Sequence, residues 1–499
     1  LPLVEKVVAE ISDWTDARLD FFLTACDISE DNVEATAARV KSTLTGRGCP
    51  EGRAEGLVRM WFVRCDFLLC EFAREFDVVL GNPPYIRFDD LSTLQQGEYK
   101  FRYETFSERC DIYVPFFEKA LALLSADGVL AFICSNRFAK SSYGRRLRSL
   151  ISRKYRVALY LNMEHAQPFE REVSAYPAIY ILDRHVGGRT FAKTIDDASR
   201  KTLLASMAST GNLSAFDTWY RDGAPWISTD ADLRKFAERM ARRFPVIEES
   251  AAGTEIGIGV ASGADDLYVD AQEKCDLEKD CLLPLVMASD IDNGVITWRG
   301  RYILNPYDGV DDRIMKDLAK YPKMAAYLEE HAQRLKGRYC AKKHPNSWYR
   351  TLDRIRYRVL RSPKLLLPDI QGGGNVALDE RGCLYPHHNV YWIISEEWNL
   401  RALCVLMRSS FVTNQVRCFS SEMRGGFIRY QAQNLRKVHI PHVHSLTVAE
   451  VERLAALYEE HDCARIDGIV DAVIRRTASR RMPTGAQKRI GEEYLQAVG

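Results

Sequence analysis

Long hydrophobic runs are missing from this sequence of 499 residues. No stretch reaches about 18 consecutive apolar residues, the length expected of a helix that crosses a membrane. The first residues, LPLVEKVVAEISDW, lack the basic segment and the small-residue cleavage site of a secretory signal peptide. The 46% hydrophobic and 27% charged residues are typical of a globular protein. We therefore expect a soluble protein of roughly two or three domains without a membrane partner.

Cysteine pairs with metal-binding spacing are also missing. The sequence holds thirteen cysteines, but none form a Cys-x-x-Cys pair and none cluster with histidines at zinc-site spacing. An odd number of scattered cysteines is typical of reduced thiols in a cytoplasmic protein. We predict a cytoplasmic location and no metal site.

The net charge of +1 identifies no partner, but the basic residues are unevenly placed. Residues 334–364 hold eleven Lys or Arg and one acidic residue. Aromatic residues are interleaved with them, namely Tyr339, Trp348, Tyr349 and Tyr357. This pattern is typical of a surface that binds the phosphates of a nucleic acid, although a solvated basic face would give the same charge run. The residues predicted to contact phosphates are Arg338, Lys342, Lys343 and Arg350.

Strand and helix signals alternate over residues 1–185. Apolar segments that predict strands lie at 20–29, 63–69, 76–81, 128–135, 156–163 and 175–182. Ser29 is a good N-cap for a helix that ends near Gly46 or Gly48, and residues 111–128 predict an amphipathic helix. The alternation predicts an α/β domain with a doubly wound sheet.

The polarity of the sequence and the elements that it predicts change after residue 185. Residues 186–250 are more polar and predict a connecting segment, and residues 251–445 mix short strands with glycine-rich turns. We expect the latter to form a second, α+β domain. Residues 446–499 predict a C-terminal helical tail, whose amphipathic part is 447–476.

The segment DVVLGNPPYIRF at 77–88 has the strongest chemical signal. Residues 76–80 read as a short, buried parallel strand. Pro83 and Pro84 cannot continue it, because proline has no amide donor and a fixed φ. The chain must therefore leave the sheet at the carboxyl end of a strand, where open α/β sheets bind ligands.

Asn82 and Pro83 suit a reaction at an amino group on a planar ring, such as N6 of adenine. The lone pair of that nitrogen is delocalised into the ring, so it is a poor nucleophile. The amide oxygen of Asn82 and the backbone carbonyl of Pro83 can accept hydrogen bonds from its two N–H groups, and they stabilise the positive charge that develops during attack. Pro84 stiffens the loop, and Tyr85 can stack on a base that has been flipped out of a duplex. A strand-ending turn with a proline pair is the structural alternative.

Asn-Pro-Pro-Tyr after a strand resembles the signature of S-adenosylmethionine-dependent amino-methyltransferases. The family includes N6-adenine DNA methyltransferases, enzymes that methylate a glutamine of release factors and some that modify guanine in ribosomal RNA. The resemblance implies a Rossmann-like methyltransferase domain, with S-adenosyl-L-methionine as cofactor and Asn82 beside it.

The resemblance also implies roles for two acidic residues. Asp27 stands after the first strand and before a helix, where the family has the acid that binds the cofactor ribose. Asp66-Phe67-Leu68 resembles the motif that contacts the cofactor adenine. Asp27 as a helix cap and Asp66 as a turn residue are the alternatives.

The glycine-rich loop that meets the methionine end of the cofactor in this family has no match before Asp27, and the order of the other motifs is the gamma type. We therefore expect that this chain begins after that loop. Residues 255–266 contain three glycines, but they resemble instead the opening of the specificity domain in TaqI-like adenine methyltransferases. Phe169, in QPFEREVSAYPAIYIL, matches the family's second stacking residue, with a core phenylalanine as the alternative.

A long domain after the catalytic one favours DNA over the other substrates. The segments up to RGGFIRYQAQNLRKVHIP resemble the TaqI-like specificity domain, in which Arg424 and Arg429 are candidates for reading base edges. We predict an adenine-specific methyltransferase for double-stranded DNA, within a restriction-modification or phage-defence system whose other proteins are its partners. The alternatives are an N-methyltransferase for a protein glutamine or an RNA amino group, and a catalytically silent DNA-recognition protein.

Overall fold

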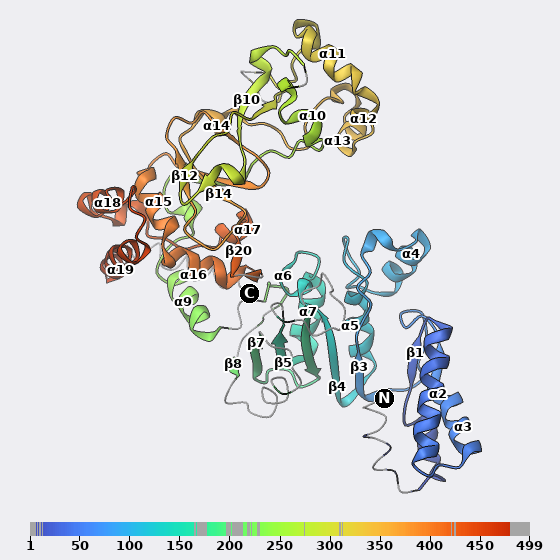
Figure 1. Ribbon diagram of the computed structural model, residues 1–499. Coiled ribbons are helices and arrows are strands. Elements are labelled where there is room, and N and C mark those ends of the chain that lie inside the picture. Colours follow the sequence, from blue (N-terminus) through green and yellow to red (C-terminus); the bar gives the residue numbers. More distant parts are fainter. Residues whose placement is uncertain are drawn as a thin grey trace. The chain divides into compact units, whose positions relative to one another are not determined.

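The computed structural model consists of two compact units (Figure 1). Unit 1 comprises Leu1–Leu161, Ala175–Phe191 and Arg221–Gly223, and unit 2 comprises Asn162–Ser174, Ala192–Tyr220 and Ala224–Gly499. The structure describes residues 6, 8, 11, 13–163, 166, 177–195, 201, 213–216, 220, 222–226, 230–273, 275–308, 311, 313–420, 422–423 and 426–479. Among these residues, no helix is long and apolar enough to span a membrane.

Unit 1 begins with a small parallel sheet and two helices. Strand β1 (Ala25–Asp27) pairs with β2 (Phe62–Arg64), and α2 (Glu30–Gly46) and α3 (Glu51–Trp61) connect them. As predicted, Ser29 caps α2, with its side chain accepting a hydrogen bond from the Asn32 backbone N–H. The two helices enclose a core that includes Val40, Leu44, Leu57 and Trp61.

A mixed six-stranded sheet, in which β3, β4 and β6 belong wholly to unit 1 and β8 to unit 2, confirms the predicted α/β class. Its order is β3-β4-β6-β5-β7-β8. Strand β4 pairs parallel with β3 and antiparallel with β6. The bounds are β3 (Phe76–Gly81), β4 (Leu124–Ser135), β5 (Arg156–Asn162), β6 (Pro177–Asp183), β7 (Thr190–Thr194) and β8 (Ser214–Phe216). The helices of this part are α4 (Thr93–Arg102), α5 (Tyr113–Ala122), α6 (Arg137–Lys140) and α7 (Arg145–Lys154).

Two details of this sheet differ from the sequence-based expectations. The helix predicted at 111–128 ends at Ala122, because β4 already begins at Leu124. The strand at 76–80 is not fully buried, since Val78 is 57% and Leu80 47% exposed. The physical reason is that β3 stands at the end of the strand order and pairs only with β4 among the described strands.

Unit 2 is built around a four-stranded antiparallel sheet with apolar cores on both faces. The order is β16 (Ala377–Asp379), β14 (Lys364–Pro368), β18 (Val390–Ile394) and β9 (Glu255–Ile258). Successive residues of β14 alternate between the faces. Leu365 and Leu367 enter one core, whereas Leu366 enters the other.

Helices cover the first of these cores. They are α9 (Ala231–Ala241), α15 (Leu400–Arg408), α16 (Ser410–Phe419), α17 (Ala432–Leu435), α18 (Val448–Ala455) and α19 (Cys463–Ser479). The amphipathic pattern at 447–476 therefore corresponds to two helices, α18 and α19. Three short strands lie nearby in the sequence, namely β15 (Ile370–Gln371), β19 (Glu422–Met423) and β20 (Phe427–Arg429).

The second core of unit 2 is enclosed by short elements. The strands are β10 (Leu282–Val286), β11 (Ile291–Asp292), β12 (Val295–Ile296), β13 (Tyr302–Leu304) and β17 (Tyr385–Pro386). The helices are α10 (Asp265–Tyr268), α11 (Pro322–Glu330), α12 (Ala332–Lys336), α13 (Tyr339–Lys343) and α14 (Tyr357–Arg361). The basic stretch 334–364 therefore lies on α12, α13, α14 and their connections.

Candidate active site

The loop after β3 leaves the sheet as the prolines require. Gly81 ends the strand opposite Phe132 of β4, where a Cβ atom would come within 2.9 Å of the Phe132 ring. A larger residue would push the loop away from β4. Beyond it, Asn82 is exposed while Pro83 is buried. The loop is thus anchored on one side and presents the amide of Asn82 on the other.

Tyr85 is only partly exposed. Burial, together with the nearby Cys134 at the end of β4, raises the pKa of its phenol well above the ordinary value. The phenol therefore stays neutral at physiological pH. Its ring lies near the carboxyl end of β4, the strand that pairs with β3.

The sequence-based reasoning missed Asp111, which lies next to the end of this loop. The backbone N–H of Ile112 donates to the carbonyl of Ile86 at 3.0 Å, which ties the start of α5 to the loop. Burial raises the pKa of Asp111, and Arg137 and a 3.5 Å hydrogen bond from the Tyr143 hydroxyl oppose this effect. An acid at the start of a predicted helix, within CDIY, was the available sequence signal.

Asp27 and Asp66 lie at the same edge of the β1–β2 pair. Asp27 ends β1, and Asp66 follows β2 by two residues, so parallel pairing brings both to the carboxyl ends of neighbouring strands. The Asp27 carboxylate is exposed and accepts a hydrogen bond from the Ser29 backbone N–H at 2.8 Å. Oxygen atoms of this carboxylate remain accessible to ligand hydroxyl groups.

Asp66 is held by both of its oxygens. Oδ1 accepts from the Leu68 backbone N–H at 2.9 Å, and Oδ2 accepts from the hydroxyl of Tyr99, a buried residue of α4, at 2.6 Å. Each oxygen keeps a further lone pair, so the fixed carboxylate can still accept from an amino group. The two acids therefore fit the nucleoside end of S-adenosylmethionine. Both also make the cap-like or turn-like contacts named as alternatives.

Similar proteins show to which family this chain belongs. A family model described as Eco57I restriction-modification methylase matches residues 26–169. The chain is 38% identical over 458 residues to the Type II methyltransferase M.PaeR7I of Pseudomonas aeruginosa, an alignment covering 88% of this chain and 78% of that protein. It is 37% identical over 455 residues to M.XhoI of Xanthomonas vasicola, covering 88% and 82%. This chain belongs to the Type II DNA methyltransferases.

This membership confirms the function predicted from the sequence. The protein is an S-adenosylmethionine-dependent DNA methyltransferase of a restriction-modification system, and the Eco57I family methylates N6 of adenine. Its fold resembles that of the Type IIL restriction-modification enzyme MmeI, solved in complex with DNA, with a TM-score of 0.53 at 15% identity. The likeness covers 84% of this chain and 57% of MmeI, and it concerns the fold alone.

Part of the basic stretch is engaged in contacts within unit 2. Arg338 donates to the backbone carbonyls of Ser262, Trp348 and Arg350 at 2.8–3.0 Å. Its guanidinium also lies over the ring of Tyr268. Arg338 therefore holds the fold together in this structure rather than facing phosphates.

Other members of the stretch divide into paired and exposed residues. Arg350 lies beside the buried phenol of Tyr307, and Lys364 is fully buried and donates to Asp379 at 2.7 Å. By contrast, Lys342 and Lys343 are exposed on α13. These two lysines are accessible from solvent.

Arg429, one of the residues predicted to read base edges, is engaged by an acid of its own unit. It forms a two-pronged ion pair with Asp369, next to the pairing of β15 with β20. Arg424, the other such candidate, and Phe169, the predicted second stacking residue, lie outside the described residues.

Proposed function

We propose that the loop Asn82-Pro83-Pro84-Tyr85 carries out the methylation of adenine N6 in double-stranded DNA. The amide oxygen of Asn82 and the carbonyl of Pro83 accept hydrogen bonds from the amino group of a flipped adenine, and Tyr85 stacks on its ring. The observation that carries the proposal is the exposed amide of Asn82 directly beside a buried Pro83 at the carboxyl end of β3.

The rate enhancement comes from acceptors that are already in place before the reaction. As the amino nitrogen becomes more positive, the two oxygens stabilise it without moving, because Gly81 and the prolines fix the loop. No titratable base takes part at this position, which agrees with the choice of an amide. The proton that leaves the nitrogen passes to solvent.

The cofactor supplies the electrophilic methyl group. We infer that Asp27 binds the ribose hydroxyl groups and that Asp66 accepts from the adenine amino group of S-adenosylmethionine, with Asn82 near the transferred methyl. The hydrogen bond from Tyr99 to Asp66 supports this assignment, since it fixes the carboxylate in one orientation.

We also infer that a further strand pairs with the outer edge of β3 and brings the glycine-rich loop of the gamma-type motif order. The place of β3 at the end of the strand order supports this inference, because its outer backbone edge has no partner among the described strands. The TaqI-like details and the doubly wound arrangement are part of the same proposal.

Unit 2 recognises the DNA target in this proposal. Residues 251–445 form the recognition domain, between a connection at 186–250 and a helical tail at 446–499. Lys342 and Lys343 contact phosphates, whereas Arg338 and Arg350 support the fold from within. Arg424 and Arg429 read base edges, for which Arg429 must exchange Asp369 for a guanine. Phe169 provides the second stacking face for the flipped base.

The test is incorporation of a labelled methyl group from S-adenosylmethionine into duplex DNA, compared between the natural protein and Asn82→Ala. Loss of N6-methyladenine with unchanged DNA affinity supports the assignment. Equal turnover by the two proteins would remove Asn82 from the mechanism.

A further inference from the structure

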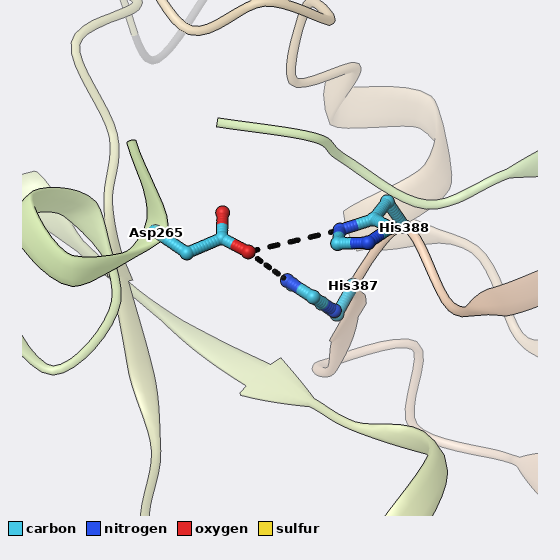
Figure 2. Close-up of side chains that lie close together, drawn as sticks. All are labelled: Asp265, His387 and His388. Carbon is cyan, nitrogen blue, oxygen red and sulfur yellow. Dashed lines mark hydrogen bonds and ion pairs between the residues drawn. The ribbon is translucent and has the colours of Figure 1, made fainter. Parts of the chain in front are cut away.

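One group of metal-ligand side chains in unit 2 includes none of the residues assigned to the methyltransferase site. Within the described part of the chain, Asp265, His387 and His388 are the one set of three His, Cys, Asp or Glu residues whose ligand atoms all lie within 4.8 Å of one another (Figure 2). All three belong to unit 2. Asp265 begins α10, and the two histidines lie between β17 and β18.

The spacing of the ligand atoms suits a tetrahedral ion. His387 Nε2 lies 3.1 Å from Asp265 Oδ2, and His388 Nδ1 lies 3.9 Å from the same oxygen. Zinc binds imidazole nitrogen and carboxylate oxygen at about 2.0–2.2 Å, which places two tetrahedral ligand atoms about 3.4 Å apart. The two observed distances lie on either side of this value.

A tight turn allows two consecutive histidines to face one carboxylate. In a straight strand, neighbouring side chains would point to opposite faces. Here the Val390 N–H donates to the His387 carbonyl at 2.8 Å, which closes a turn. The two imidazole centroids are consequently only 4.0 Å apart, and both rings approach Asp265.

The hydrogen bonds around His387 require a cation between it and Asp265. Asn389 Oδ1 accepts from the Ala288 backbone N–H, so the same oxygen also accepts from His387 Nδ1 at 3.0 Å. With its proton on Nδ1, a neutral imidazole turns the lone pair of Nε2 towards the carboxylate of Asp265. Two lone pairs at 3.1 Å repel each other unless a proton or a metal ion separates them.

The remaining contacts leave one oxygen of Asp265 and the exposed ring of His388 available to an ion. The Ser262 hydroxyl donates to Asp265 Oδ1, which leaves Oδ2 for the histidines. The side chains of Asp265 and His388 are 44% and 46% exposed, so an ion can reach them from solvent.

We propose that Asp265, His387 and His388 bind a divalent transition-metal ion of the zinc type, with water in the fourth position. Two imidazoles and one carboxylate suit zinc better than the all-oxygen sites of magnesium or calcium. Asn389 orients the buried ligand His387 through its other ring nitrogen. The ion fastens the start of α10 to the turn that precedes β18.

No local pattern in the sequence indicates this site, because Asp265 and His387 are 122 positions apart. The sequence lacks zinc-type spacing and therefore predicts no metal, whereas the fold brings three ligand side chains together.

The experiment uses the whole chain, purified without a histidine tag and stripped with a chelator. Co²⁺ is the spectroscopic probe, because its visible absorption distinguishes tetrahedral from octahedral coordination. Zn²⁺ affinity is measured by calorimetry, and thermal unfolding is followed with and without Zn²⁺. An ion that binds only the folded state raises the melting temperature.

Two variants separate the site from ordinary surface histidines. His388→Ala removes an exposed ligand without touching the buried ring of His387. His444→Ala is the matched control, since His444 is another exposed histidine, 3.6 Å from Glu397. We expect one tetrahedral Co²⁺ in the natural protein and in His444→Ala, and at least a tenfold weaker affinity in His388→Ala.

The proposal is overturned if the natural protein binds no Co²⁺ or Zn²⁺, or if His388→Ala binds them as tightly as His444→Ala does. In the first case a proton on His387, paired with Asp265, fills the role of the cation. Because the Co²⁺ spectrum is recorded on the natural protein as well, the test does not depend on the folding of a variant.

Discussion

The loop at 82–85 and the basic stretch at 334–364 both have strong sequence signals, but they differ in how many of their predicted residues are accessible in the structure. In the loop, Asn82 is exposed while its neighbours are anchored, so the residue expected to act is the one left accessible. In the stretch, Arg338 and Lys364 are occupied by internal partners, and Lys342 and Lys343 remain exposed. The structure thus leaves the predicted residue of the short motif accessible, whereas several of the charges counted in the stretch have partners within the fold.

The largest effect expected is that of Asn82→Ala on the chemical step. Loss of a preorganised polar group aimed at the developing charge costs about 10²-fold or more in rate. Single-turnover methylation of duplex DNA measures this, with cofactor and DNA affinities as controls that should hardly change. A rate within a few-fold of that of the natural protein would mean that the loop motif predicts functional residues no better than the basic stretch does.

Arg338→Ala should affect stability rather than DNA binding. A hydrogen bond to a charged group contributes roughly 1.5–3 kcal/mol, and this replacement removes several at once, so we expect the free energy of unfolding to fall by about 3 kcal/mol. Denaturant unfolding of Arg338→Ala and of Lys342→Ala gives the comparison, and the lysine variant should keep its midpoint. If Arg338→Ala is as stable as the natural protein, its carbonyl contacts are incidental.

Asp66→Ala should weaken the affinity for S-adenosylmethionine by about 1.5–3 kcal/mol, because a charge-assisted hydrogen bond is removed. Tyr99→Phe, which deletes only the hydroxyl bonded to Asp66, should have a smaller effect in the same direction. Asp27→Ala is expected to weaken the binding of the cofactor as well. Calorimetry with the cofactor in the absence of DNA is the measurement, and unchanged affinity in all three variants would leave the acids with structural roles only.

Tyr85→Ala should impair capture of the flipped base, since stacking on an aromatic ring contributes roughly 1–3 kcal/mol per base. Tyr85→Phe keeps the ring and should retain most activity. Because burial raises the pKa of the phenol, its ionisation plays no part, and the pH profile of Tyr85→Phe should match that of the natural protein. A profile that shifts on this replacement would show that the hydroxyl takes part in the chemistry.

The smallest effect is expected for Lys342 and Lys343. Removal of one phosphate-binding charge flattens the plot of log affinity against log salt by about 0.9. Replacing both lysines with alanine should therefore weaken binding to all DNA sequences alike and leave the methylated site unchanged. Binding at several salt concentrations measures the slope. An unchanged slope would mean that the whole stretch, and not only its paired members, is a structural or solvated surface.

Some features of the structure could be predicted from residues close together in the sequence, and others could not. The apolar run at 76–81 and the N-cap Ser29 are local signals, and both the strand and the helix formed as predicted. The exposure of Val78 depends on what packs against that face of β3, which its own sequence does not reveal. The partners of Arg338 are the backbone carbonyls of Ser262 and Arg350. Every residue has a backbone carbonyl, so the sequence does not show which ones an arginine will contact. Asp265 and His387 meet through the fold alone.

The most direct test of the central claim identifies the methylated atom. Duplex DNA is incubated with the protein and labelled S-adenosylmethionine, digested to nucleosides and analysed by mass spectrometry, beside an equal reaction with Asn82→Ala. The account predicts that the label appears in N6-methyladenine and falls by about 10²-fold or more in the variant. Label on a cytosine, or N6-methyladenine formed equally well without the Asn82 amide, would contradict it.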